Sequence, residues 1–460
     1  MAVVVETSVW EPSPALYVFI FFACLFSILF FPYASGTANT SAASVAKAPS
    51  LFDHGGSPTA SSFRFQRNFL LLYSLASVME GLWSVFGEFE LAYYGLSKEK
   101  MVLYLCVGFA ASISIGSLLG VVCDLIGPKK VCFFFCLLHL LVGLLKRIIP
   151  HPSVWMASIC LSITSSVFSF GFETWMVVQH DEQGHRQDML SETFWLMSFF
   201  ESACLIGSQV FSNWLIGNNA ERSMAAHSTA AIFLAAISLV CLTKGCKEIP
   251  HKVALKEYRA SFRAYIVGDK RIWLLAWAQA CLHFSVAVFW ILWAPTIVAD
   301  GREVHLGLIY PCFLGSRMLG STVFPWLISG LSSLRTEDCL VYAFIVLGLV
   351  MSITAYDYQE VGMLVTLFCI FHAGLGVVLP SLARLRTMYV PNALRGGMIS
   401  LSQAPANAAI LLFLVQGKYH NNIGNSTIIA FSALGLFTAA GCMHVLKRWG
   451  KQPYQNWHKL

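Results

Sequence analysis

Five ionisable residues stand in the middle of long apolar stretches of the sequence. They are Glu80, Glu201, His283, Arg317 and His372. If these stretches cross a membrane, a charged group at the centre costs at least about 2.5 kcal/mol and requires a partner or water. Intramembrane residues of this kind are candidates for contact with ions, protons or polar solutes. These five side chains are therefore the first candidates for a functional site.

Arg317 offers the most specific chemistry of the five. Its planar guanidinium presents paired N–H donors that match planar or tetrahedral oxyanions. One interpretation is therefore that Arg317 binds an anionic solute. The alternative is a structural ion pair with Glu201, and a pair that opens while a solute binds would satisfy both interpretations.

Three other candidates each have a functional and a structural interpretation. Glu80 either carries a coupling proton, which a buried carboxyl group holds more readily than an exposed one, or hydrogen-bonds to polar groups of neighbouring helices. His283 and His372 either relay protons and bind an anion when charged, or are neutral core residues.

Two amides flank a proline in a later apolar stretch. Gln403 and Asn407 lie on either side of Pro405. A proline inside a membrane helix kinks it and leaves a backbone carbonyl without its usual partner. We therefore expect Gln403 and Asn407 to line a cavity at this point.

The composition places these residues in a helical membrane protein. Of the 460 residues, 57% are hydrophobic and 12% are charged, whereas soluble domains have about 25% charged residues. The charged residues are separated by apolar runs of about 20 residues, the length that crosses a bilayer core of about 30 Å. The runs are continuous rather than alternating, so they predict α-helices and exclude a β-barrel.

The same composition argues against several classes of function. The 14 cysteines lie almost all in apolar runs and include no Cys-x-x-Cys pair, which favours buried thiols over a metal or disulfide framework. The sequence has no nucleophile–base constellation and no phosphate-binding loop. The net charge of +6 belongs to loops rather than to a nucleic-acid surface. We therefore expect no enzyme activity, cofactor, metal or nucleic-acid partner.

The apolar runs predict one leading helix followed by twelve core helices in two groups of six. The predicted segments are a leading transmembrane helix (1–33), a cytoplasmic linker (34–68), a six-helix half (69–243), a basic cytoplasmic loop (244–270), a second six-helix half (271–446) and a cytoplasmic tail (447–460). Two equal halves indicate an internal duplication, which the similar stretches Gly116–Gly120 and Gly315–Gly320 support. Within the basic loop, Leu255 to Tyr265 is mildly amphipathic and is expected on the anionic inner leaflet.

The distribution of Lys and Arg predicts the orientation. With the loop after the second core helix in the cytoplasm, cytoplasmic segments hold 22 of the 30 basic residues and outer segments hold 7, while Arg317 lies within a helix. Cytoplasmic loops of membrane proteins carry the excess of basic residues. We therefore expect an N-terminus outside or in a lumen and a C-terminus in the cytoplasm, in the plasma membrane or an endomembrane.

The loop after the second core helix carries a recognisable pattern. It reads Gly120-x-x-x-Asp124-x-x-Gly127-x-Lys129-Lys130. Together with the six-plus-six plan, this pattern resembles the major facilitator superfamily. Asp124, Lys129 and Lys130 are then expected in a short cytoplasmic hinge, where water meets lipid headgroups, and to take part in gating.

Most of the chain after Phe63 also resembles one branch of that superfamily, the molybdate-anion transporters. The matching stretches are Phe172-Glu-Thr-Trp175, Gly268-Asp-Lys270, Leu292-Trp-Ala-Pro295, Met318-Leu-Gly-Ser321, and Pro380 to Arg386 followed by Tyr389-Val-Pro391. The chain departs from the branch at His283, where the branch has an acidic residue, and at Gln403, where it has arginine.

The resemblance implies the all-α major facilitator fold of two six-helix halves, here with one leading helix. In that fold the helices that carry the five buried ionisable residues face a central cavity. The implied substrate-binding candidates are Arg317, His283, Gln403, Asn407 and His372. The implied coupling and gating candidates are Glu80, Glu201, Glu173, Asp124, Lys129 and Lys130.

The activity implied by the resemblance is secondary active transport of molybdate or a similar small anion by alternating access. The expected partners are that anion, protons for coupling, and membrane lipid. Glu173 is expected to form an inner gate with Arg386 or Arg395. The alternative is a receptor or scaffold that keeps the fold without transporting a solute.

Overall fold

The computed structural model describes the backbone of most of the chain. The described residues are 9–30, 58–93, 95, 97–149, 154–184, 187–216, 220–245, 254–329, 334–356, 360–419 and 424–449. Within these ranges the backbone is almost entirely helical, and an isolated β-bridge joins Trp10 to Val304. Residues 34–57 of the predicted linker and residues 450–460 of the predicted tail lie outside the described residues.

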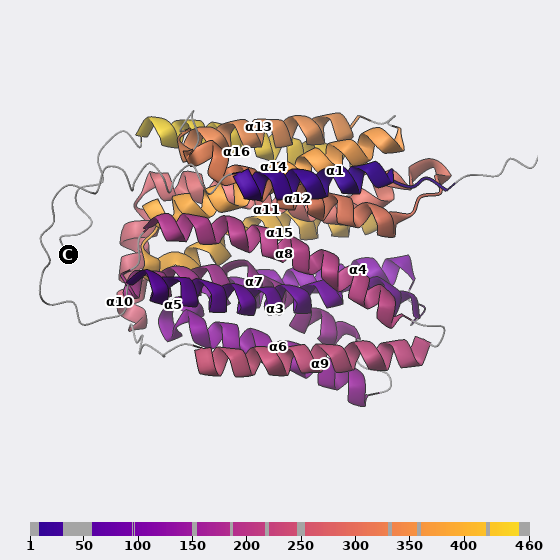
Figure 1. The fold of residues 1–460 in the computed structure, drawn as a ribbon, viewed down its shortest axis with the longest axis horizontal. Coiled ribbons are helices and arrows are strands. Elements are labelled where there is room, and N and C mark those ends of the chain that lie inside the picture. Colours follow the sequence, from indigo (N-terminus) through magenta and orange to yellow (C-terminus); the bar gives the residue numbers. More distant parts are fainter. Residues whose placement is uncertain are drawn as a thin grey trace, which may run out of the picture.

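Long helices run side by side through the molecule (Figure 1). The first half contains α3 (Pro58–Tyr93), α4 (Lys98–Ala111) with α5 (Ser117–Ile126), α6 (Pro128–Ile148), α7 (Val154–Glu182), α8 (Gln187–Leu215) and α9 (Ala220–Gly245). The second half contains α11 (Lys270–Ile297), α12 (Leu306–Ser329), α13 (Thr336–Thr354), α14 (Val361–Tyr389), α15 (Arg395–Tyr419) and α16 (Asn425–Trp449). A π-helical turn, Ser112–Gly116, joins α4 to α5 without a break. Ten of the described helical segments are long and apolar enough to cross a membrane.

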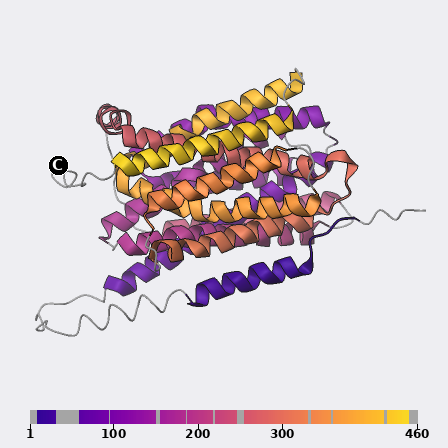
Figure 2. The same ribbon diagram turned by 90° about the horizontal axis from the view of Figure 1, so that it is seen from above.

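The predicted leading helix is present as α1 (Pro14–Phe30). It lies at the outside of the bundle (Figure 2) and packs along α12. The Tyr17 hydroxyl donates to the carbonyl of Leu308, and the Ser27 hydroxyl donates to the carbonyl of Thr322. The predicted fold of two six-helix halves with one additional helix is thus confirmed.

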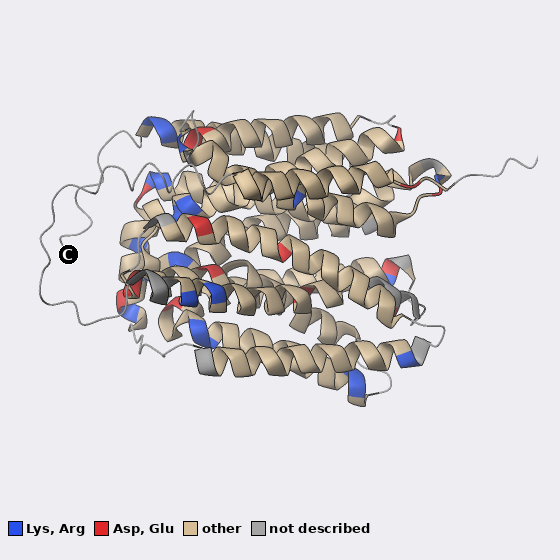
Figure 3. Cartoon of the chain, viewed as in Figure 1, with Lys and Arg blue, Asp and Glu red and all other residues tan. Residues whose placement is uncertain are grey.

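The short helix α10 (Leu255–Phe262) lies between the halves in sequence and at one end of the bundle in space (Figure 1). We call this end the α10 end. Figure 3 shows that charged residues gather toward this end, while the middle of the bundle has few. The amphipathic stretch predicted here is helical, but its Tyr258 side chain is 5% exposed and buried against the protein rather than turned toward lipid.

The starts of α6 and α3 have different causes. The tight turn before α6 requires Gly127, which has a φ of 102°, and Pro128 then begins the helix with a pre-set φ. The start of α3 differs from the prediction, because the helix begins at Pro58 rather than at residue 69. Phe65 stacks on Phe69 one turn later, and Gln66 donates to the Thr193 hydroxyl of α8. These contacts continue the helix into a stretch whose polar composition is typical of a linker.

Candidate functional site

A cavity of about 680 Å³ lies between the two halves. All five of the ionisable residues from the apolar stretches line it: Glu80, Glu201, His283, Arg317 and His372. They come from α3 and α8 of the first half and from α11, α12 and α14 of the second. Residues separated by almost 300 positions in the sequence therefore meet around one space.

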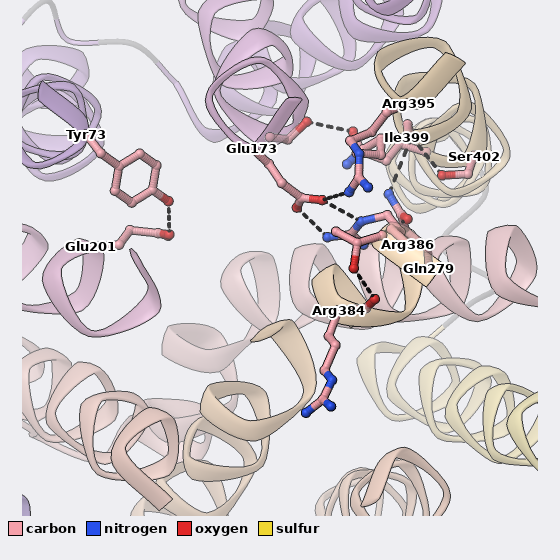
Figure 4. Close-up of polar contacts among 12 residues, drawn as sticks. Tyr73, Glu173, Glu201, Gln279, Arg384, Arg386, Arg395, Ile399 and Ser402 are labelled. Carbon is pink, nitrogen blue, oxygen red and sulfur yellow. Dashed lines mark hydrogen bonds and ion pairs between the residues drawn. The ribbon is translucent and has the colours of Figure 1, made fainter. Parts of the chain in front are cut away.

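An ion pair between the halves stands in the wall of the cavity. Arg317 Nη2 of α12 lies 2.8 Å from Glu201 Oε1 of α8. The other carboxylate oxygen of Glu201 accepts a hydrogen bond of 2.6 Å from the Tyr73 hydroxyl of α3 (Figure 4). The guanidinium Nε of Arg317 has no hydrogen-bond partner among the described residues. The ion-pair interpretation of Arg317 holds in this state, and the same side chain also faces the cavity.

His372 lies beside this pair in an aromatic surrounding. Its ring is stacked on Phe313, with 5.4 Å between the centroids and 5° between the planes. The edges of Phe289 and Trp290 approach it from α11. The side chain is 1% exposed, and neither ring nitrogen has a hydrogen-bond partner within the described part of the chain. His372 thus supplies two unused polar atoms next to Arg317.

Glycines bring α12 and α14 into backbone contact and so position these two side chains. A Cβ atom at Gly320 would lie 1.9 Å from the carbonyl oxygen of Ala373, and one at Gly376 would lie 2.2 Å from the carbonyl oxygen of Arg317. Only residues without a side chain allow so close an approach. The approach holds Arg317 and His372 on facing turns of the two helices.

The remaining predicted binding residues form two polar pairs. His283 Nε2 lies 2.8 Å from Asn407 Oδ1, and the Ser169 hydroxyl donates to Gln403 Oε1 over 3.0 Å. His283 and Gln403 line the cavity, whereas Asn407 is buried behind His283 rather than on the described wall.

Glu80 has a partner that the sequence did not indicate. Its Oε1 lies 3.1 Å from Nε2 of His139, a residue of α6 that is 1% exposed. The helix α6 therefore contacts a residue of the cavity wall directly.

Glu173 of α7 lines the cavity and contacts two arginines of the second half (Figure 4). Its Oε1 accepts from Arg386 Nε over 2.8 Å and from Arg395 Nη1 over 3.2 Å, so the carboxylate binds both predicted arginines. Arg386 also donates to the side-chain carbonyl of Gln279 over 3.1 Å. Arg395 is fully buried, and its charge therefore depends on this carboxylate for compensation.

Asp124 lies in a different place from the one predicted. It was expected at the boundary between water and headgroups, but it is 4% exposed and buried between the halves. It accepts hydrogen bonds from the backbone N–H groups of Gly396 and Gly397 over 2.9 and 2.7 Å. These amides open α15, where the first N–H groups lack helical partners and attract a carboxylate. The helix ends approach closely because Gly120 has no side chain: a Cβ there would lie 2.3 Å from the carbonyl oxygen of Gly396.

The helix α10 adds a third donor to Asp124. The Tyr258 hydroxyl donates to Asp124 Oδ2 over 3.0 Å. Burial and the neighbouring Asp124 raise the pKa of Tyr258 well above its usual range, so the phenol keeps its proton at neutral pH. Lys129 and Lys130 follow at the start of α6, half-buried and exposed respectively, and neither is among the residues lining the cavity.

Sequence reasoning missed Tyr73, His139, Gln279 and Tyr258. One signal was available for Tyr73. The residues Tyr73, Ser77, Glu80 and Ser84 recur at helical spacing and all line the cavity, so they form one polar stripe on α3. The other contacts join helices whose relative rotation a single sequence does not reveal.

Comparison with known proteins agrees with this architecture. A family model described as sugar transporters with 12 transmembrane segments matches residues 38–369, well over half of the chain. The chain belongs to this family of the major facilitator superfamily.

Relatives in the family carry a more specific name. A molybdate-anion transporter of Takifugu rubripes is 25% identical over 287 residues, which are 57% of this chain and 59% of that protein. Molybdate-anion transporters of Xenopus tropicalis and Xenopus laevis are 22% and 24% identical, each over 76% of this chain and 78% of the relative.

Solved structures show the same fold at lower identity. A bacterial homologue of the iron transporter ferroportin, in an outward-facing state with soaked iron, has a TM-score of 0.64 at 14% identity and covers 84% of this chain and 99% of its own. The Escherichia coli fucose:proton symporter has a TM-score of 0.63 at 12% identity and covers 83% and 98%. These structures share the fold of this chain.

Proposed function

We propose that this protein is a secondary transporter that carries a small oxyanion of the molybdate class through the central cavity by alternating access. The observation that carries the proposal is Arg317, a buried guanidinium that faces a cavity between two halves and keeps an unused N–H donor. A guanidinium matches an oxyanion through paired hydrogen bonds. The names of the relatives support the molybdate class.

The proposed roles follow the geometry of the wall. Arg317 and His372 bind the anion, and His283 and Gln403 complete the polar lining, with Asn407 orienting His283.

The coupling and gating roles lie beyond this lining. Glu201 and Glu80 are the candidates for coupling to protons, because each carboxylate faces the cavity. Glu173 gates the α10 end, and the segment from Asp124 to Lys130 is the hinge.

The state in this structure is closed at the α10 end. The contacts of Glu173 and Asp124 join the halves there, and the cavity extends from Glu173 to Leu306 and Gly307 near the opposite end of α12. If the excess of basic residues places the α10 end in the cytoplasm, the cavity faces the outside or the lumen. Transport then requires the α10 end to open while the opposite end closes.

Uptake into vesicles tests this function. Vesicles that contain the purified full chain should accumulate radiolabelled molybdate, and excess sulfate should reduce the uptake. Replacing Arg317→Gln should raise the KM for molybdate at least tenfold, because the bound anion loses its charged partner. Removing one partner of a buried charge pair costs about 2–5 kcal/mol, and each 1.4 kcal/mol is a factor of ten. The matched control is Arg448→Gln, a change at an exposed residue of α16 outside the cavity.

Two outcomes would count against the proposal. Equal uptake by the Arg317→Gln variant and the unaltered protein would remove Arg317 from the path. Absence of uptake by the unaltered, folded protein at every pH would favour a receptor or scaffold that retains the fold.

A further inference from the structure

The arginines of the cavity lining are already paired before any anion enters. Its lining contains three carboxylates, Glu80, Glu173 and Glu201, and two guanidinium groups, Arg317 and Arg386. Each of the two guanidinium groups already contacts a carboxylate. An oxyanion that binds Arg317 therefore competes directly with Glu201 for the same positive charge.

The contacts of Glu201 allow it to release Arg317 when it takes up a proton. One of its oxygens accepts from Arg317 and the other accepts from the Tyr73 hydroxyl. If Glu201 takes up a proton, it loses the charge that attracts Arg317 but keeps its hydrogen bond with Tyr73. The carboxyl group then remains satisfied in place, whereas an ionised carboxylate displaced from Arg317 would be a buried charge with one neutral partner.

Polar atoms next to this carboxylate without hydrogen-bond partners in the described part of the chain indicate where the anion would sit. Nε of Arg317 and both ring nitrogens of His372 lack hydrogen-bond partners among the described residues, and His372 is 1% exposed. Buried polar atoms are normally satisfied, so unused ones at a cavity wall point to a ligand. The aromatic rings around His372 keep water away and strengthen the attraction between an anion and Arg317.

Few other charged or titratable groups surround Glu201. Tyr73 approaches from α3 and Arg317 from α12. His372 of α14 interacts electrostatically with Arg317, and Cys204 of α8 interacts with Glu201 itself. The next helix, α9, has no acidic or basic residue between His227 and Lys244. Proton uptake at this place is therefore assigned to Glu201.

We propose that Glu201 is the coupling site for protons and that the anion and the ionised carboxylate occupy Arg317 in turn. One proton from the cavity water binds to the Glu201 carboxylate as the anion replaces it on Arg317. When the anion leaves, the proton leaves too, and the pair between Glu201 and Arg317 forms again. One proton therefore accompanies each anion. This inference rests on the proposed transport of an oxyanion.

The variant Glu201→Gln separates coupling from transport. The amide has the shape of a protonated carboxyl group, so the variant stays in the anion-accepting form. We expect molybdate binding that no longer depends on pH. Exchange of internal for external molybdate should persist, whereas net uptake driven by a pH gradient and the accompanying movement of protons, followed with a dye inside the vesicles, should be lost.

Tyr73→Phe provides a second test if the first variant does not fold. The Tyr73 hydroxyl donates a hydrogen bond to the Glu201 carboxylate, and such a donor stabilises negative charge on its acceptor. Without the hydroxyl, the pH dependence of molybdate uptake should move toward higher pH. An unchanged pH profile in this folded variant would contradict the inference.

The remaining outcomes distinguish this inference from the function on which it rests. If Glu201→Gln keeps proton-coupled uptake while Glu80→Gln loses it, the proton site is the Glu80 carboxylate. Molybdate uptake by the unaltered protein without any proton movement would overturn the coupling and leave anion transport intact. If the unaltered protein neither binds nor transports molybdate or sulfate, both proposals fail together.

Discussion

At the scale of single residues, one carboxylate holds the two halves together near the α10 end. Glu173 of α7 accepts from Arg386 of α14 and from Arg395 at the start of α15. Both arginines are more than nine-tenths buried. Their two positive charges face one carboxylate, so the cluster is held by charge and not by packing alone.

We predict that Glu173→Gln destabilises the folded protein. The amide leaves two buried guanidinium groups without a negative partner, and breaking a buried pair from one side costs about 3–5 kcal/mol. The midpoint of thermal unfolding, measured on the purified protein in detergent, should fall clearly below that of the unaltered chain. The control is Glu99→Gln at an exposed residue of α4, where no change is expected. Equal midpoints for the two variants would show that the cluster contributes little to stability.

The positions of the buried ionisable residues were predictable, and most of their partners were not. A charged residue inside an apolar run is visible in a sequence because it violates the pattern around it. The pairing of Arg317 with Glu201 was anticipated because two opposite charges at similar depth require compensation. The contact of Glu80 with His139 was not anticipated, because it depends on how α3 and α6 rotate toward each other.

At the scale of helices, length and hydropathy predicted the all-helical fold. The second half was expected to begin at residue 271, and its first helix, α11 (Lys270–Ile297), begins one residue earlier. The start of α3 at Pro58 was missed because contacts with α8, rather than hydrophobicity, extend that helix. The packing of α12 on α14 through glycines was equally invisible, since a glycine in a helix has several explanations.

We predict that Gly320→Ala strongly reduces the yield of folded protein. Its new methyl group would lie 1.9 Å from the carbonyl oxygen of Ala373, which is backbone and cannot rotate away. Overpacking in a core costs about 1–3 kcal/mol and more when backbone must move. The control is Gly441→Ala in α16. A Cβ atom added at Gly441 would have no neighbouring atom within 4 Å, and alanine has a higher helix propensity than glycine, so the yield of this variant should be unchanged. Size-exclusion chromatography measures the yield of monodisperse protein for both variants. Equal yields would contradict the close contact between Gly320 and Ala373.

At the scale of the whole molecule, the two halves meet differently at the two ends. At the α10 end, Asp124 accepts from two backbone amides of α15 and from Tyr258 of α10. Near the opposite end, the Gln209 side chain of α8 donates to the carbonyl of Gly307 over 2.7 Å. Pro311 has no N–H to offer that carbonyl, so the bond between the halves replaces a missing helical one. The hinge pattern in the sequence located the Asp124 region, but not its burial, which arises only when the second half covers it.

We predict that Asp124→Asn shifts the protein toward the state that is open at the α10 end. An amide presents one acceptor oxygen in place of two and carries no charge for the start of α15. Hydrogen bonds to charged groups contribute about 1.5–3 kcal/mol, and each 1.4 kcal/mol is a tenfold change in the ratio of two states. In a background with its cysteines replaced, spin labels at the exposed residues Ile126 and Met388 report the separation of the halves at this end. Their distance distribution should gain a longer component.

The matched control for this shift is Asp338→Asn, which removes an ion pair with Lys447 inside the second half. It weakens a carboxylate contact of similar kind without touching the surface between the halves, so the label distances should stay as in the unaltered protein. A longer component in both variants would indicate general destabilisation rather than loss of the Asp124 contacts between the halves. No longer component in the Asp124→Asn variant would mean that Glu173 and the glycine contacts alone keep this end closed, and that Asp124 stabilises α15 without controlling the opening of the cavity.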